Sequence, residues 1–470
     1  MIRFSDGGAL AICIVPPSSS FFPMRLTGTE IFAVPVGTDV GHDDNESVWI
    51  IHSPVKDEIA LVAHDDFLRF LQYFEDGVSP EDDQLEDLIS EMVCKEMTPQ
   101  SVTIPDIRKT SKLSILPNHI CNFSCSYCYS AAGRSTTRMS WEKMQSALDF
   151  FIDENRIAPQ PLSIFISGGG EPLLSWDTVS KAITYARTRS EEKGFSLQIS
   201  IITNGSLLTE EIAEFAAVNN CSVCVSFEVL PQLQESQRKY FQAVSKNIEM
   251  LGRKKVRTLL NSTITPLSVD KMQEMVLEVI RRYPFVDQYT MEPVTGVSLF
   301  QSSDELRKFY DAFFEGYIAS KQIADSHGIN LRFTFDDALR GTSVRHCPGK
   351  FCLTPQGDIT ICHLASSPKE MRYADCVYGR IEEDGGVFID TDKFSRLYGK
   401  NVFAYNRCRD CFAKWSCGGE CMTRNDTYPP DYMEEVCGFN RRFVKHLLIE
   451  RVRKNVEEEY NMSLEEYVRQ

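Results

Sequence analysis

The chain has 470 residues, of which 43% are apolar and 25% are charged, values typical of a globular protein with about three domains. Its formal net charge of -16 argues against a nucleic-acid binder, because phosphate contacts need clustered Lys and Arg, and is compatible with a basic peptide partner. No segment approaches the ~20 consecutive apolar residues of a membrane span, and the apolar start lacks a basic region and a cleavage site. We therefore expect a cytoplasmic protein with no membrane segment and no signal peptide.

Residues 1–100 predict a small α+β module. Residues 47–53 and 58–64 have the composition and alternation of two strands joined by a turn. Residues 66–74 and 81–93 have apolar side chains at helical spacing, and the second helix is acidic. A hairpin with helices of this size is either a binding module or a structural cap on the next domain, and the sequence leaves both interpretations open.

Residues 101–336 alternate between strand and helix patterns. After Ser140, for example, apolar residues recur at the spacing of an amphipathic helix. They are Met144, Ala147, Leu148 and Phe151. The predicted strands are 113–116, 162–166, 197–202, 223–226, 259–264 and 289–294. Six such units predict an α/β fold with a parallel sheet and right-handed crossovers, either open or curled into a partial barrel.

Polar motifs follow the predicted strands at the points where the strands end. Because the carboxyl ends of parallel strands meet at one edge, we expect these motifs to lie together at an active site. In chain order they are the cysteine loop 121–128, Ser167-Gly-Gly-Gly-Glu171, Thr203-Asn204-Gly205, Ser226-Phe-Glu228, Thr263 with Thr265, and Glu292.

The chain contains 16 cysteines, and metal or iron–sulfur ligation explains them better than disulfides in a reducing compartment. Eleven of them fall into two groups, at 121–128 and, leaving out Cys376, at 347–437. The first group is a CxxxCxxC motif made by Cys121, Cys125 and Cys128. Three thiolates are one fewer than a closed zinc site or a complete iron–sulfur cluster needs, so an iron left open could hold a substrate or cofactor. A zinc knuckle is the alternative.

These motifs resemble those of the radical S-adenosylmethionine (SAM) superfamily over residues 112–300. The resemblance is carried by the CxxxCxxC loop, the Gly169-Gly170-Glu171 motif and the order of the strands. It implies a partial (β/α)6 TIM-like barrel in which Cys121, Cys125 and Cys128 hold a [4Fe–4S] cluster. The open iron of that cluster chelates SAM, and reduction cleaves SAM to methionine and a 5′-deoxyadenosyl radical that abstracts a substrate hydrogen.

The resemblance also implies contacts with SAM, position by position. The expected contacts are the methionine ammonium for Glu171, the adenine for the backbone near Tyr127, and the ribose for Ser226. Asn204 and Thr263 line the same pocket, and Gly169 and Gly170 let the backbone approach the ligand closely. Arg238 is either a partner of the SAM carboxylate or a solvated helix charge. Glu228 departs from the Asp-Gly found at this place in many relatives.

The second cysteine group resembles the SPASM extension of radical SAM enzymes, which houses two auxiliary clusters. This implies three [4Fe–4S] clusters in all. The inner auxiliary cluster takes Cys347, Cys362 and Cys421, with Cys352 either a fourth ligand or a core residue, and the outer one takes Cys408, Cys411, Cys417 and Cys437. A zinc ribbon over residues 408–421 remains an alternative. The domains are then 1–100, a radical SAM core at 101–336, a SPASM domain at 337–445 and a C-terminal helix at 446–470.

SPASM proteins mostly modify peptides, so the favoured activity is that of a peptide maturase. Such an enzyme forms a thioether or carbon–carbon cross-link on a ribosomally made precursor peptide, and an electron donor such as a flavodoxin or ferredoxin reduces it. Residues 1–100 would bind the leader of the precursor by strand addition to a sheet edge.

Two other functions compete with the peptide maturase. An anaerobic sulfatase maturase oxidises Cys or Ser to formylglycine and places an Asp, its proposed base, after the cysteine that corresponds to Cys362. This chain has His363 there, which could act as a base at neutral pH but counts against that activity. An iron–sulfur electron carrier is the non-enzymatic alternative, and it would leave the Gly-Gly-Glu motif without a role.

Overall fold

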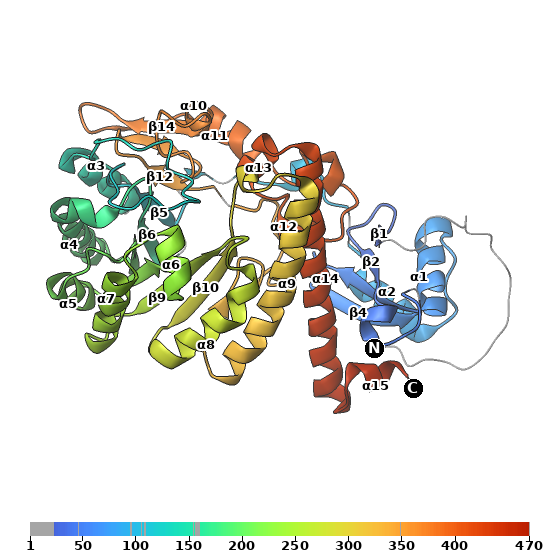
Figure 1. The fold of residues 1–470 in the computed structure, drawn as a ribbon. Coiled ribbons are helices and arrows are strands. Elements are labelled where there is room, and N and C mark those ends of the chain that lie inside the picture. The colour runs from blue at the N-terminus through green and yellow to red at the C-terminus, as the bar shows by residue number, and fades with distance from the viewer. Residues whose placement is uncertain are drawn as a thin grey trace.

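The computed structural model describes residues 23–469, except for 46, 95, 105, 108, 109, 154, 156–159 and 348. In the described residues the chain forms a parallel α/β body, a small N-terminal module and a C-terminal extension (Figure 1). No helix in these ranges combines the length and the apolar character needed to cross a membrane.

The N-terminal module is a four-stranded antiparallel sheet with two helices on one face. The two predicted strands and the two predicted helices are all present. Two further strands were not predicted, because β2 is four residues long and buried on both faces, so that it shows no alternation. The elements are β1 (Met24–Arg25), β2 (Phe32–Pro35), β3 (Val48–Ser53), β4 (Glu58–Ala63), α1 (His64–Asp76) and α2 (Asp83–Met92), and the strand order is β1-β2-β3-β4.

The two faces of this sheet are buried against different parts of the protein. Trp49 and Ile51 of β3 pack with α1 and α2 in a core that belongs to the module alone. Val48 and Ile50, which point the opposite way, join the main core of the protein. The module is therefore packed onto the rest of the chain and is not separated from it by a linker.

The central body is a parallel sheet whose strands lie side by side in chain order. Its strands are β5 (Lys112–Ile115), β6 (Leu162–Ile166), β7 (Leu197–Thr203), β8 (Cys221–Ser226), β9 (Thr258–Ile264), β10 (Gln288–Pro293) and β11 (Leu331–Arg332). Its helices are α3 (Trp141–Phe151), α4 (Trp176–Glu192), α5 (Glu210–Val218), α6 (Pro231–Gln237), α7 (Phe241–Arg253), α8 (Met272–Arg282) and α9 (Ser303–Ser326). An order without reversal is that of a curled, barrel-like sheet, and the helices lie along its outer face (Figure 1). All six predicted strands are present within two residues of their predicted ends.

The C-terminal extension continues the same sheet beyond β5. Strand β12 pairs in parallel with β5, and three antiparallel strands follow, so the sheet ends at β15 and stays open. The elements are β12 (Phe351–Leu353), β13 (Asp358–Thr360), α10 (Tyr373–Cys376), β14 (Val377–Ile381), β15 (Val387–Ile389), α11 (Thr391–Tyr398), α12 (Lys414–Cys417), α13 (Met422–Thr427), α14 (Pro430–Tyr460) and α15 (Leu464–Val468).

Helix α14 runs between the barrel and the N-terminal module (Figure 1). It begins at Pro430, where the fixed φ of proline suits the first helical turn, and it contains Cys437. The C-terminal helix predicted to start at residue 446 therefore starts much earlier, and the predicted boundary between 445 and 446 falls inside one continuous helix.

Candidate active site at the carboxyl edge of the sheet

The glycines that follow β6 press against the start of the cysteine loop. A Cβ atom on Gly170 would lie 2.1 Å from the carbonyl oxygen of Ile120, and Gly169 has a positive φ of 88°. The Glu171 amide donates a hydrogen bond of 2.7 Å to the same Ile120 oxygen. Only residues without a Cβ allow this approach, so the motif fixes where the cysteine loop leaves the sheet.

The carboxylate of Glu171 joins the ends of two neighbouring strands. It is 2% exposed, and it accepts hydrogen bonds from the Thr203 hydroxyl at 2.6 Å, the Asn204 amide at 2.8 Å and the Leu173 amide at 3.1 Å. Burial raises its pKa, while these donors favour the ionised form. Because a carboxylate has about four acceptor positions, one remains for the predicted SAM ammonium.

Asn204 continues this network to the first cysteine. Its Nδ2 atom lies 2.9 Å from Asn122 Oδ1 and 3.9 Å from Cys121 Sγ. The Arg134 guanidinium donates to Cys128 Sγ at 3.2 Å. The second and third strand-end motifs are therefore brought to the cysteine loop, as the strand order led us to expect. Ser226 and Thr263 lie on the same edge, at or next to the ends of β8 and β9.

A buried triad connects the cysteine loop to the end of β8. Tyr127 donates a hydrogen bond from its hydroxyl to Glu228, and Arg238 donates to the Tyr127 oxygen at 2.8 Å. Arg238 Nη1 lies 3.7 Å from Glu228 Oε1, and their side chains are 9% and 0% exposed. Arg238 is thus not a solvated helix charge. Burial opposes ionisation of the Arg238 guanidinium, but its interactions with Tyr127, Cys125 and Glu228 outweigh burial and raise its pKa.

Two polar atoms of this triad and one of the neighbouring Gln237 are buried and have no hydrogen-bond partner in the part of the chain that the structure describes: Glu228 Oε2, Arg238 Nε and Gln237 Nε2. A buried polar atom without a partner costs about 1–3 kcal/mol. Two of these atoms are donors and one is an acceptor, and all lie near the half-buried thiols of the cysteine loop, which can hold an iron–sulfur cluster. This set fits a zwitterionic ligand such as the methionyl part of SAM.

The four cysteines of the predicted outer cluster line one cavity. Its lining includes all four thiols together with Lys414, Glu420 and Arg441, and the cavity measures about 20 Å³. The four are Cys408, Cys411, Cys417 and Cys437. Asn440 donates to Cys417 Sγ at 3.4 Å and also to Glu420. Although burial opposes ionisation, the Arg424 charge and the hydrogen bonds from the Cys421 amide and Asn440 lower the pKa of Glu420 to about 2.

The cysteines of the predicted inner cluster lie around β12 and β13. Cys352 is fully buried in β12, and burial raises its pKa to about 12, with a further contribution from Cys362 and Cys347. Cys362 Sγ lies 3.8 Å from the Thr423 hydroxyl, and burial, followed by the neighbouring Cys421, raises the pKa of Cys362. Over the described residues, no three Cys, His, Asp or Glu side chains converge as they would around a single metal ion.

His363 is held by a lysine. Lys350 Nζ lies 2.8 Å from His363 Nδ1, and an ammonium can only donate, so Nδ1 accepts and the neutral ring carries its proton on Nε2. Burial, followed by the Lys350 charge, lowers the pKa of His363 to about 3. Tyr129 packs edge-on to this ring at 5.9 Å, is 46% exposed, and has its hydroxyl over Gly168.

Several of these residues were not singled out by the sequence. Tyr129 follows a cysteine ligand candidate, which is the only local signal it carries. Lys350 and Asn440 carry none, because their partners are 13 and 23 residues away and on other elements.

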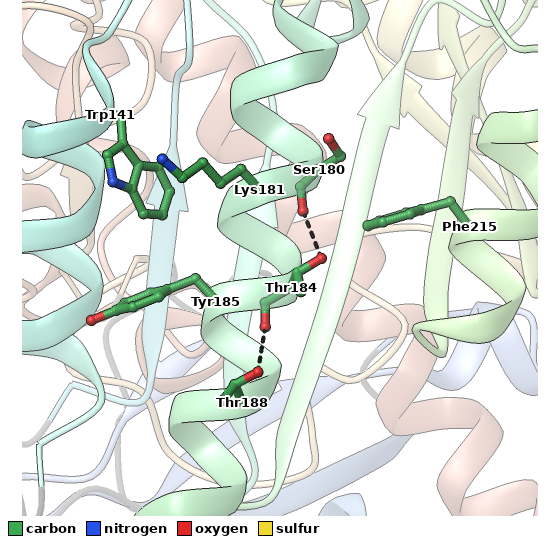
Figure 2. A pocket seen from close by; sticks show the side chains of 7 residues that line it. All are labelled: Trp141, Ser180, Lys181, Thr184, Tyr185, Thr188 and Phe215. Carbon is green, nitrogen blue, oxygen red and sulfur yellow. Dashed lines mark hydrogen bonds between the residues drawn. The ribbon is translucent and has the colours of Figure 1, made fainter.

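A second hollow lies outside the sheet, between α3, α4 and α5 (Figure 2). It measures about 460 Å³ and is lined by Trp141, Lys181, Tyr185 and Phe215, with Lys181 Nζ 4.0 Å from the centre of the Trp141 ring. None of the strand-end residues lines it, so the chemistry expected of this chain does not lie there.

Residues 115–279 match the family model of the radical SAM superfamily. The chain therefore contains a radical SAM domain. Among curated relatives, this radical SAM chain is 20% identical over 342 residues to the "Radical SAM cyclopropyl synthase TigE" of Paramaledivibacter caminithermalis, covering 66% of this chain and 67% of that protein. It is 23% identical over 312 residues to a "Cysteine-type anaerobic sulfatase-maturating enzyme" of Clostridium novyi, covering 60% and 77%.

Solved structures share its fold. "Native anSMEcpe with bound AdoMet" superposes with a TM-score of 0.56 at 17% identity, covering 72% of this radical SAM chain and 98% of that one. SuiB of Streptococcus suis bound to its precursor peptide SuiA gives a TM-score of 0.50 at 14% identity, covering 82% and 97%. At this identity the likeness describes the fold alone.

Proposed function

We propose that this radical SAM enzyme is a peptide maturase that forms a thioether or carbon–carbon cross-link on a ribosomally made precursor. The observation that carries the proposal is the cysteine loop 121–128, fixed by Glu171 and by the Tyr127–Glu228–Arg238 triad, in and beside which three buried polar atoms have no partner among the described residues. An electron carrier has no need for such a ligand-binding cradle.

Cys121, Cys125 and Cys128 would hold the SAM-binding [4Fe–4S] cluster. When bound and reduced, it supplies the electron that cleaves SAM and so generates the hydrogen-abstracting radical. Arg238 would bind the SAM carboxylate with its free Nε, and Glu171 would accept from the ammonium. Tyr127 would fix the adenine side of the loop, while Gly169 and Gly170 keep the backbone close enough for these contacts.

A SPASM domain with two auxiliary [4Fe–4S] clusters completes the proposal. The cavity lined by four thiols supports the outer ligand set of Cys408, Cys411, Cys417 and Cys437. Cys347 and Cys362 lie close enough to Cys352 to raise its pKa, and Cys421 likewise raises the pKa of Cys362. This proximity supports the inner ligand set. A flavodoxin or ferredoxin is the electron donor that such clusters would use.

The N-terminal module is the proposed binding site for the leader peptide. β4 is an end strand of its sheet. The Val36–Val48 and His64–Ser47 hydrogen bonds fix which residue pairs of β3 and β4 are hydrogen-bonded. In this register Ile59 and Leu61 belong to non-hydrogen-bonded pairs, so their backbone N–H and C=O groups point away from β3. No described strand pairs with that edge. An extended peptide can add there as a further strand.

Charge supports a basic leader. Residues 1–100 contain 19 acidic and five basic residues, whereas the rest of the chain contains 47 and 45. On α2, which contacts β4, Asp83, Asp87 and Glu91 are exposed one helical turn apart. Like charges at this spacing destabilise a helix, and a Lys- or Arg-rich peptide would relieve their repulsion.

The relative from Clostridium novyi keeps the sulfatase maturase as the second candidate. Such an enzyme needs a base where this chain has His363. Its Nδ1 is occupied by Lys350, and protonation would place two cations together, which disfavours that role. This favours the peptide maturase.

The test is mass spectrometry of a precursor peptide encoded beside the gene, incubated without oxygen with the reconstituted enzyme, SAM and dithionite. A cross-link lowers the mass by two hydrogen atoms and keeps the sulfur. A Cys-containing sulfatase peptide that instead loses its thiol to an aldehyde would establish the other activity.

A further inference from the structure

A carboxylate of the N-terminal module is buried in the segment that carries the outer cysteines. Glu30 is 0% exposed, and its Oε2 atom lies 2.7 Å from both Lys414 Nζ and Trp415 Nε1. Its Oε1 atom accepts from Arg25 at 3.0 Å. Lys414 and Trp415 are 5% and 0% exposed, so Glu30 is the buried counter-ion of a buried cation.

Lys414 and Trp415 lie in helix α12, between two of the cysteines. Lys414 lines the cavity that the four outer thiols share. Its amide donates to the Cys411 carbonyl at 3.1 Å, and the Cys417 amide donates to Ala413 at 2.8 Å. The position of Lys414 is therefore linked through short backbone hydrogen bonds to the positions of both cysteines.

The hairpin that carries Glu30 is itself rigidly held. In the connection between β1 and β2, the Thr29 hydroxyl accepts a hydrogen bond from the Ile31 amide at 3.1 Å and donates one to the Leu26 carbonyl at 2.9 Å. Arg25 donates to the Thr29 carbonyl at 2.6 Å and reaches Asp410, next to Cys411, at 3.7 Å. Hydrogen bonds within the hairpin therefore fix Glu30, and Arg25 adds a second contact to the segment that carries Cys411.

We propose that the N-terminal module completes the outer cluster site, with Glu30 as the positioning residue that holds the Cys411–Cys417 segment through Lys414 and Trp415 and offsets the Lys414 charge beside the cluster. This inference rests on the proposed outer cluster. It makes the leader-binding module and that cluster one structural unit, in which a change at the module reaches the cluster ligands.

The test compares Glu30→Gln with Asp57→Asn in the full-length, reconstituted chain. Asp57 pairs with Arg451 at 2.6 Å and also joins the module to α14, but neither residue contacts the Cys411–Cys417 segment that Glu30 holds. Glu30→Gln is expected to lose the outer cluster iron, or to keep it with a shifted midpoint potential in an EPR-monitored redox titration. Asp57→Asn is expected to match the wild type.

The Cys437→Ala chain identifies the outer signal, since it lacks one proposed ligand. If Cys437→Ala matches the wild type in both iron content and EPR signal, the outer cluster itself is wrong and the inference falls with it. If Cys437→Ala changes the iron content or the EPR signal but Glu30→Gln equals the wild type in iron content and potential, only the inference is overturned.

A second variant covers a Glu30→Gln chain that does not fold. Glu30→Gln combined with Lys414→Met leaves no unpaired buried charge and is expected to restore both folding and the outer EPR signal. Comparison of the wild type with Cys437→Ala identifies the outer EPR signal. A double variant that folds but does not regain that signal would overturn the role of the Glu30–Lys414 pair.

Discussion

The guanidinium of Arg238 lies 2.8 Å from the hydroxyl of Tyr127, one of the two residues between the second and third cysteines of the CxxxCxxC loop. The two residues are 111 positions apart in the chain. This contact places a buried cation beside the proposed cluster, and its Nε has no hydrogen-bond partner among the residues that the structure describes.

Replacing Arg238 by Gln is therefore expected to weaken SAM binding about 10- to 100-fold, since a hydrogen bond to a charged group is worth about 1.5–3 kcal/mol. Anaerobic equilibrium dialysis with SAM measures the dissociation constant. Arg281→Gln is the matched control, because Arg281 is an exposed helix residue whose ion pair among the described residues is with Glu278. Equal affinities for the two variants would rule out the proposed role of Arg238.

Removing the hydroxyl that Glu171 accepts from should destabilise the edge of the sheet. Thr203→Val removes one hydrogen bond to the buried Glu171 carboxylate, which is expected to lower the free energy of unfolding by about 1–3 kcal/mol. Thr203→Ser keeps the donor. Anaerobic thermal unfolding of both variants measures the difference. A Val variant as stable as the Ser variant would show that the Thr203–Glu171 contact does not hold these strands together.

Neutralising the α2 acids should weaken precursor binding and flatten its salt dependence. The variant is Asp83→Asn, Asp87→Asn and Glu91→Gln, measured by anisotropy with a labelled Lys/Arg-rich leader at two ionic strengths. The matched control neutralises Glu382, Glu383 and Asp384, three acids in the connection between β14 and β15, away from the module. If the control weakens binding as much, the effect is one of total charge and not of this surface.

The packing of the module is expected to loosen in acid. Burial lowers the pKa of His52 to about 4, from 6.5 in the unfolded chain. The unfolded state thus binds more protons below pH 6.5, and the stability that the neutral ring gives at neutral pH is lost as the pH falls toward 4. At pH 5 the loss is about 2 kcal/mol.

Limited proteolysis of the module at pH 7 and pH 5 measures this change. His52→Leu cannot titrate and should show little difference between the two pH values. His327→Gln, at an exposed helix end, should behave as the wild type. Equal acid sensitivity of the wild type and His52→Leu would assign the effect to another group.

The sequence predicted the barrel and the edge that carries the site, because both depend on local signals. Apolar runs bounded by glycine or proline mark β6 and β7, and the residues at each strand end must share one edge of a parallel sheet. Helix α3 has its four predicted apolar residues buried. These features need no knowledge of distant contacts.

The contacts that hold the site in place were beyond reach of the sequence. Tyr127 meets Glu228 across 101 positions, and Glu30 meets Trp415 across 385. No spacing rule joins such residues, because only the packed strands and helices bring them together. Glu228 attracted notice as a strand-end residue and as a departure from the family pattern, neither of which pointed to Tyr127, and Glu30 attracted none.

The formation of 5′-deoxyadenosine tests the central claim most directly. The reconstituted wild-type enzyme, given SAM and dithionite without oxygen, is expected to release it, and a chain with Cys121, Cys125 and Cys128 changed to Ala is expected to release none while keeping iron elsewhere. Cleavage of SAM by the triple variant, or a zinc ion in the loop of a wild-type enzyme that does not bind SAM, would contradict the account.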